Sequence, residues 1–200
     1  MSRLKCKRCL RPENHCLCAL IPMLESHTRV LILQHPDEAK HALNTARFAA
    51  LGLANAELWV GERFALDEVL NDARYQTCLL FPGSQAQALI RCDHITKPLQ
   101  LIVPDGTWRK ARKLLYLNPE LETLPKVTLE MIKPSRYRLR KAPMEESLST
   151  LEAITQALEV LEQKDFSALL KPFDALIDGQ IAAMGYSTFE RNYVAHKKGA

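Results

Sequence analysis

The sequence of 200 residues contains no apolar run near 18 residues, the length that would cross a bilayer. Its basic N-terminus is not followed by an apolar segment, so we expect no signal peptide, no membrane association and a cytoplasmic location. Aromatic residues make up only 6%, and there is neither an internal repeat nor a low-complexity tract. The length of 200 residues is enough for one α/β domain with a core of its own plus a small appendage, which is the organisation we expect.

The chain also carries little net charge, +4, but its positive residues are unevenly distributed. More than half of its 27 Lys and Arg residues fall in segments 3–11, 109–113, 133–141 and 197–198. Solvated surfaces usually intersperse charges of both signs, so this clustering favours a polyanionic partner. The alternative is that these segments are ordinary solvated faces.

Cysteines are clustered in this sequence. Four of the six lie close together near the N-terminus as Cys6-x-x-Cys9-x6-Cys16-x-Cys18. Two close pairs of thiolates can complete a tetrahedral set, and in a reducing compartment zinc fits best. An iron–sulfur cluster, free structural cysteines, or His15 in place of one cysteine are the alternatives. Four protein ligands leave no open position, so a structural zinc knuckle is expected.

The order of apolar runs and periodic segments predicts strands alternating with helices, and therefore a mostly parallel sheet flanked by helices. Strands are expected at 29–33, 57–60, 77–81, 99–103 and 127–132. Helices are expected at 36–52, 64–72, 108–117, 149–161 and 177–193, with a helical turn at 85–90. The basic stretch 134–147 is expected to be a functional loop.

The run Leu101–Trp108 combines a strand end with a carboxylate, a glycine, a hydroxyl and an indole, and a basic helix follows at once. Strand ends that feed helices are where α/β proteins place ligands. Asp105 is therefore a candidate to accept a proton or to bind an amine of a ligand. The structural alternative is that Asp105 caps the helix and Trp108 fills the core.

Three further segments carry polar residues suited to a site. Phe81-Pro82-Gly83-Ser84 is a second small-residue turn at a strand end, and the two turns would form one cleft if their strands were neighbours. Asn44 is expected in mid-helix, facing either a site or solvent. The segment 135–153 interleaves Arg and Tyr, as RNA-binding surfaces do, and its Glu152 matches a capping box with Ser149.

Taken together and in order, the cysteine motif, Asn44-Thr45, Phe81–Ser84, Asp105-x-Thr107-Trp108 and 135–153 resemble the DTW-domain family over nearly the whole chain. The resemblance implies a SPOUT-related α/β fold with a C-terminal trefoil knot. It also implies tRNA-uridine aminocarboxypropyltransferase activity. In that reaction the 3-amino-3-carboxypropyl group of S-adenosylmethionine moves to N3 of a tRNA uridine, and 5′-methylthioadenosine is released. With the cysteine motif, we therefore expect a zinc-binding module at 1–25 and a catalytic domain at 26–200.

Carried over residue by residue, Asp105, Thr107 and Trp108 fall on the motif that names the family. Asp105 is the expected catalytic residue, which takes the uridine proton or holds the donor amine, and Arg140 is the candidate ligand of the donor carboxylate. The residues expected to bind S-adenosylmethionine are Phe81, Pro82, Gly83, Ser84, Asp105, Gly106, Thr107, Trp108, Arg140, Ser149 and Thr150. Those expected to bind tRNA are Arg8, Arg11, Asn44, Arg47, Arg109, Lys110, Arg136, Tyr137, Arg138 and Lys141. A monomer is favoured, and an RNA methyltransferase or a non-catalytic zinc-containing RNA-binding module are the alternative functions.

Overall fold

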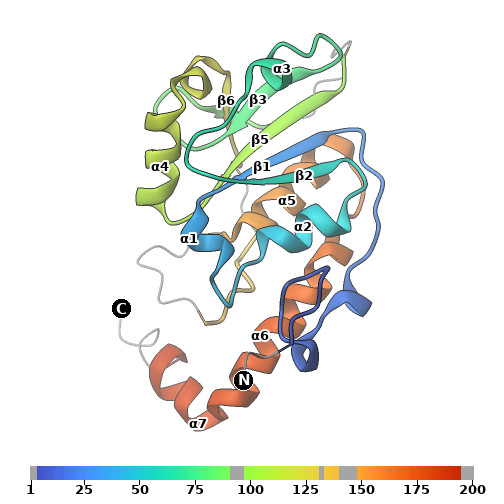
Figure 1. Cartoon of the computed structure of the whole chain (residues 1–200), viewed down its shortest axis with the longest axis vertical. Helices are drawn as coiled ribbons and strands as arrows, with labels where there is room; N and C mark the ends of the chain where they lie inside the picture. The colour runs from blue at the N-terminus through green and yellow to red at the C-terminus, as the bar shows by residue number, and fades with distance from the viewer. Residues whose placement is uncertain (1–3, 91–96, 131–132, 140–147, 195–200) are drawn as a thin grey trace.

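The computed structural model describes residues 4–90, 97–130, 133–139 and 148–194. Its centre is a sheet of six parallel strands in the order β2-β1-β5-β3-β6-β4 (Figure 1). The strands are β1 (Arg29–Gln34), β2 (Ala56–Val60), β3 (Gln76–Leu80), β4 (Gln87–Ala88), β5 (Leu99–Asp105) and β6 (Lys126–Thr128). The predicted α/β fold with a mostly parallel sheet is confirmed.

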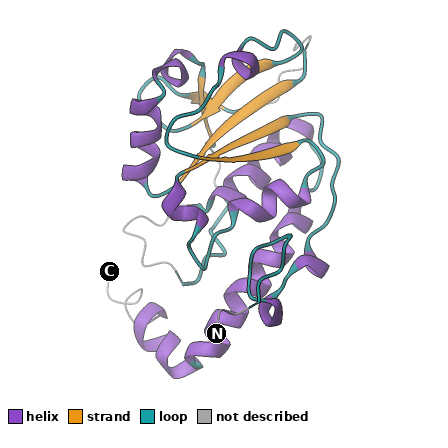
Figure 2. Cartoon of the chain, viewed as in Figure 1, coloured by secondary structure: helices purple, strands orange, loops and turns teal. Residues whose placement is uncertain are grey.

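Helices cover both faces of this sheet (Figure 2). They are α1 (Pro36–Ala39), α2 (Ala46–Gly52), α3 (Asp67–Leu70), α4 (Trp108–Leu117), α5 (Thr150–Glu162), α6 (Lys171–Met184) and α7 (Tyr186–Phe189). Short 3-10 helices lie at Glu13–His15, Cys18–Leu20, Pro119–Thr123 and Ser167–Leu170, and Glu190–Val194 forms a π-helical turn. Within the described ranges, none of the helices has the length and apolar character needed to span a bilayer.

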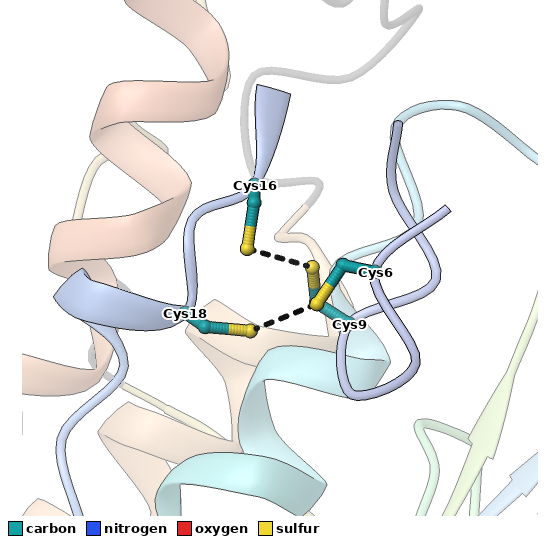
Figure 3. Close-up of side chains that lie close together, drawn as sticks. All are labelled: Cys6, Cys9, Cys16 and Cys18. Carbon is teal, nitrogen blue, oxygen red and sulfur yellow. Dashed lines mark hydrogen bonds between the residues drawn. The ribbon is translucent and has the colours of Figure 1, made fainter. Parts of the chain in front are cut away.

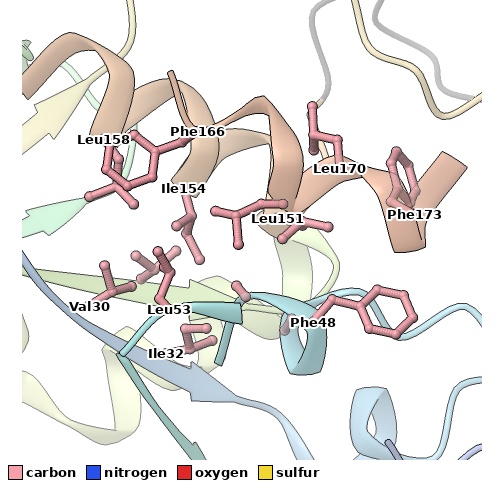
Figure 4. Packing of buried hydrophobic residues seen from close by; sticks show 14 of the residues in the cluster. Val30, Ile32, Phe48, Leu53, Leu151, Ile154, Leu158, Phe166, Leu170 and Phe173 are labelled. Atoms are coloured by element: carbon pink, nitrogen blue, oxygen red, sulfur yellow. The ribbon is translucent and has the colours of Figure 1, made fainter. Parts of the chain in front are cut away.

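The neighbouring inner strands β1 and β5 are buried on both faces, which explains their nearly continuous apolar sequences. Side chains alternate between faces along β1, so Val30 and Ile32 join one core and Leu31 and Leu33 the other. In the larger core, Val30 and Ile32 pack against residues of α2, α5 and α6, which include Phe48, Leu151 and Phe173 (Figure 4). The smaller core lies under α3 and α4.

Two predicted helices are interrupted in the structure. The segment expected as one helix at 36–52 forms α1 and α2, separated by residues 40–45. In this break the Asn44 side chain accepts a hydrogen bond from the Arg47 amide at 3.4 Å, the kind of local bond that competes with helix formation. The mid-helix placement of Asn44 was therefore wrong.

The predicted C-terminal helix 177–193 begins earlier and is interrupted at Gly185, after which α7 and the π-helical turn continue it to Val194. Helix α6 starts at Lys171, with Pro172 in its first turn, where a missing amide proton costs nothing. It stops at Gly185, whose φ of 82° is left-handed. The predicted helical turn at 85–90 was also wrong, because β4 there pairs with β6 and tertiary pairing overrides local preference.

The strand order creates a natural binding edge. The chain winds from β1 to β2 on one side and then crosses to β3 on the other, and β5 is inserted between β1 and β3. At such a reversal the connections leave in opposite directions, and ligands bind beyond the carboxyl ends of the strands. Gln34 and Asp105 are register partners at this edge.

Candidate functional site

Asp105 is the last residue of β5, and its carboxylate is held by side chains from two other elements. Gln34, at the end of β1, donates a hydrogen bond from Nε2 to Asp105 Oδ2 at 2.7 Å. Thr150, the first residue of α5, donates from its hydroxyl to Asp105 Oδ1. The carboxylate is therefore fixed by one donor on each oxygen.

Gln34 is itself oriented by Asn44 in the break between α1 and α2. The two side-chain amides exchange hydrogen bonds of 3.2 and 3.3 Å. Because Gln34 is completely buried, this pairing determines which end of its amide faces Asp105. Sequence reasoning missed Gln34, although a polar residue directly after the apolar run 30–33 was a usable signal.

A cavity of about 410 Å³ opens next to the Asp105 carboxylate. Its walls come from the break after α1, the β5–α4 turn, the segment at 133–139 and the start of α5. The lining residues are Glu38, His41, Leu43, Asn44, Thr45, Asp105, Gly106, Thr107, Lys110, Tyr137, Leu148, Ser149 and Thr150. The volume lies within the range of about 300–1,000 Å³ typical of small-molecule sites.

Burial raises the pKa of Asp105 above its ordinary value, and the nearby Glu38 carboxylate acts in the same direction. The hydrogen bonds from Thr150 and Gln34 act against this rise by stabilising the ionised form. A carboxylate that is costly to ionise and yet oriented by two donors is a better proton acceptor than an exposed one.

The structure does not support the alternative that Asp105 caps the next helix. Thr107 is the N-cap of α4, and its hydroxyl accepts a hydrogen bond from the Lys110 amide at 3.4 Å. Trp108 does not fill the core either, because 47% of its surface is exposed. Its ring instead meets Phe81 edge-on, with centroids 5.8 Å apart.

The predicted binding residues divide between the cavity and its surroundings. Gly106, Thr107, Ser149 and Thr150 line the cavity with Asp105. The strands β3 and β5 that lead to Phe81–Ser84 and to Asp105 are neighbours, which meets the condition for one shared cleft, but Phe81–Ser84 and Trp108 are not among the residues that line the cavity. Arg140 and Lys141 lie outside the described residues.

Glu152 does more than the predicted capping. It forms the capping box with Ser149, and its buried carboxylate also accepts hydrogen bonds from the Ser135 hydroxyl at 3.1 Å and the Arg136 amide at 2.6 Å. The start of α5 and the segment at 133–139 are thereby joined through one side chain. Both contribute to the cavity wall, through Thr150 and Tyr137.

Several of the basic residues expected to bind RNA have acidic partners. Arg136 and Arg138 form ion pairs with Asp174 and Asp178 of α6, the first at 2.7 Å. Lys110 pairs with Glu38 at 2.8 Å.

The other residues expected to bind RNA are distributed over several elements. Arg11 donates to the carbonyl oxygen of Ala42 at 2.8 Å, and Tyr137 packs edge-on against Phe173. Arg8 and Arg109 are exposed, whereas Arg47 is half-buried in α2.

The four N-terminal cysteines converge, with all four Sγ atoms within 4.8 Å of one another (Figure 3). Cys6 lies 3.6 Å from Cys18, and Cys9 lies 3.8 Å from Cys16, too far for disulfides. A tetrahedral zinc with Zn–S bonds of about 2.3 Å separates its sulfurs by about 3.8 Å, so the residues fit this ion. The backbone amides of Cys9 and Arg8 lower the pKa of Cys6 to about 6, whereas burial raises the pKa of Cys18 to about 12, so the cluster without metal favours the thiolate at Cys6 and the thiol at Cys18.

The fold around these cysteines supports a structural role. Leu10 follows the first pair with a φ of 60°, the left-handed turn that closes the loop, and its amide donates to the Cys6 carbonyl at 2.9 Å. Cys9 and Ile21 are buried in the larger core. His15 is not part of the cluster found among the described residues.

Comparison with known proteins places these features in a family. The DTW domain model matches residues 3–181. Proteins named tRNA-uridine aminocarboxypropyltransferase 2 are 34% identical in Drosophila melanogaster and 35% identical in Mus musculus, each match covering 90% of this chain. The chain spans 76% of the first relative and 64% of the second. No solved structure matches the chain.

Proposed function

This chain belongs to the DTW-domain family, and we propose that it is a tRNA-uridine aminocarboxypropyltransferase. The observation that carries the proposal is the buried Asp105 carboxylate, oriented by Gln34 and Thr150 at the wall of a cavity of about 410 Å³. This site lies at the reversal point of the sheet, and it is built from the motif that gives the family its name.

The cavity suits S-adenosylmethionine as the donor substrate. It offers the oriented Asp105 carboxylate, polar groups from Thr107, Ser149 and Thr150, and a volume typical of small-molecule sites. S-adenosylmethionine supplies a sulfonium leaving group. Most of the catalysis is therefore positioning of the γ-carbon against uridine N3.

In the proposed reaction, deprotonated uridine N3 forms a bond to the γ-carbon while the carbon–sulfur bond breaks. The electron pair of that bond goes to sulfur, which leaves as the thioether of 5′-methylthioadenosine. The N3 proton goes to Asp105, whose raised pKa suits it to accept this proton. Thr150 and Gln34 hold the carboxylate in place and stabilise its ionised form.

The remaining parts of the proposal concern binding and surroundings. The cysteine module holds one structural zinc ion and presents Arg8 to tRNA, together with the exposed Arg109. In the same proposal, Arg140 binds the donor carboxylate and Phe81–Ser84 lie at the outer edge of the site. The C-terminal part of the chain forms the trefoil knot.

The cysteines of the described residues form no disulfides, which suits a reducing compartment, and we propose the cytoplasm.

The test is incubation of the purified protein with S-adenosylmethionine and tRNA from cells that lack it, followed by mass spectrometry of nucleosides and by-products. We expect 3-(3-amino-3-carboxypropyl)uridine and an equal amount of 5′-methylthioadenosine. S-adenosylhomocysteine with a methylated nucleoside would show a methyltransferase instead. Binding of tRNA without consumption of the donor would show a non-catalytic module.

A further inference from the structure

The outer face of α4 carries an exposed row of aromatic and basic side chains. Trp108, Arg112 and Tyr116 follow one another at intervals of four residues, so they lie on one side of the helix, about 6 Å apart along its axis. Trp108 is 47% exposed and Tyr116 is 83% exposed, whereas Ala111, Leu114 and Leu115 face the protein interior. Such large aromatic surfaces in water indicate a binding surface.

The charges on α4 identify the kind of partner. The helix contains Arg109, Lys110, Arg112 and Lys113 and no acidic residue. Glu38 pairs with Lys110, and Glu62 pairs with Lys113 at 2.7 Å. Within the described residues, Arg109 and Arg112 form no ion pair, so their charges remain available to an anionic ligand. Exposed aromatic rings beside available guanidinium groups match unpaired nucleotides, which stack on rings and bring phosphates.

Trp108 directly follows a residue of the cavity wall and makes a defined ring contact, although it does not itself line the cavity. Its ring packs edge-on against Phe81 at the end of β3, and the preceding residue, Thr107, lines the cavity beside Asp105. Because Trp108 is the chain neighbour of Thr107 in the cavity wall, RNA that presents a base to the cavity would pass within reach of the Trp108 ring. In Figure 1, α4 lies at the periphery of the molecule. It begins near the carboxyl ends of the strands and runs away from them.

We propose that the row Trp108–Arg112–Tyr116 is a stacking platform for unpaired nucleotides that flank the reacting uridine. Trp108 and Tyr116 stack on bases, and Arg112 contacts the backbone phosphate between them. This proposal rests on the proposed function, because it takes RNA as the molecule that presents a base to the cavity. It assigns Trp108 to the RNA and not to the donor.

Intrinsic fluorescence tests the platform without any measurement of catalysis. Trp59 and Trp108 are the 2 tryptophans of the chain, so Trp59→Phe leaves Trp108 as the sole indole. Titration of this variant with a short single-stranded RNA should quench its fluorescence, and the same RNA annealed to its complement should quench it far less. Trp108→Phe protein, which retains only Trp59, should show little quenching. Equal quenching by single strand and duplex would overturn the proposal.

Affinity for the same single-stranded RNA provides the second measurement. Tyr116→Ala and Trp108→Ala should each weaken binding by about fivefold or more, while Tyr116→Phe, which keeps the ring, should bind as the wild type does. Arg112→Ala should reduce affinity more than Lys113→Ala, since both remove one positive charge but the charge of Lys113 is already paired with Glu62. Unchanged affinity in the Tyr116→Ala and Trp108→Ala proteins, or equal effects at Arg112 and Lys113, would overturn the platform.

These measurements test the platform independently of the proposed transferase activity. Quenching and weakened binding in a protein that releases no 5′-methylthioadenosine would leave the platform standing and remove the transferase activity. Normal release by the wild type together with no quenching would remove the platform and leave the activity.

Discussion

The hydroxyl of Thr150 donates a hydrogen bond to the carboxylate of Asp105 across 45 residues of sequence. This contact ties the start of α5 to the end of β5, and Gln34 completes the arrangement from β1. Three elements thus converge on one buried carboxylate. Removing the charge of Asp105 and removing its support from Thr150 are therefore separate experiments with different expected results.

Replacement of Asp105 by Asn should reduce turnover by roughly 10²-fold or more, because the amide keeps the shape but cannot accept the uridine proton. The melting temperature at neutral pH should be unchanged or higher. Burial raises the pKa of Asp105, so the folded state binds this proton more tightly than the unfolded chain does. The carboxyl therefore stabilises the fold at low pH and loses that contribution as pH rises, and Asn removes the cost of ionisation.

Release of 5′-methylthioadenosine and thermal unfolding should be measured on the same preparation of the Asp105→Asn protein. Near-normal release would show that Asp105 is not the proton acceptor. The stability difference from wild type should shrink as pH falls, since the wild-type carboxyl then becomes protonated and neutral as well.

Thr150→Val should shift the activity profile to higher pH. The hydroxyl of Thr150 lowers the pKa of Asp105 by stabilising the ionised form, and valine has the same shape without that donor. The loss of activity should therefore be larger at low pH than at high pH. Thr150→Ser is the matched control, because it keeps the hydroxyl and should keep the wild-type profile. A uniform loss at every pH would mean that Thr150 acts only through packing.

Local sequence determines the parts of this site that could be predicted. The apolar run before Asp105 marks a strand end, and Ser149 with Glu152 marks a helix start, so the edge of the sheet and the capping box were both predictable. Contacts between distant elements were not. The orientation of Gln34 depends on Asn44, and the pairing of Arg136 with Asp174 depends on where α6 packs.

Metal analysis of purified protein should give about one zinc per chain, since a closed set of four thiolates holds one ion. Cys16→Ser should lose the metal and destabilise the fold, because the loop that it anchors packs on the core through Cys9. Cys78→Ala is the control: this thiol is buried in the sheet, and burial raises its pKa to about 11, so it should not affect zinc content. Metal-free protein with normal stability and activity would contradict the assignment.

The last prediction concerns Arg136 and Arg138, which the sequence places on an RNA-binding loop and the structure pairs with Asp174 and Asp178. If these arginines contact tRNA, the α6 carboxylates compete with phosphates for them. The double variant Asp174→Asn/Asp178→Asn should then bind tRNA more tightly and with a steeper salt dependence. Arg136→Ala/Arg138→Ala should bind more weakly, its salt slope reduced by roughly one counterion per lost phosphate contact.

If the ion pairs serve only to anchor the loop to α6, both variants should weaken binding, with an unchanged salt slope. Equilibrium binding of tRNA over a series of salt concentrations separates the two results, because the sign of the Asp→Asn effect and the change in salt slope both differ between them for a loop that remains folded.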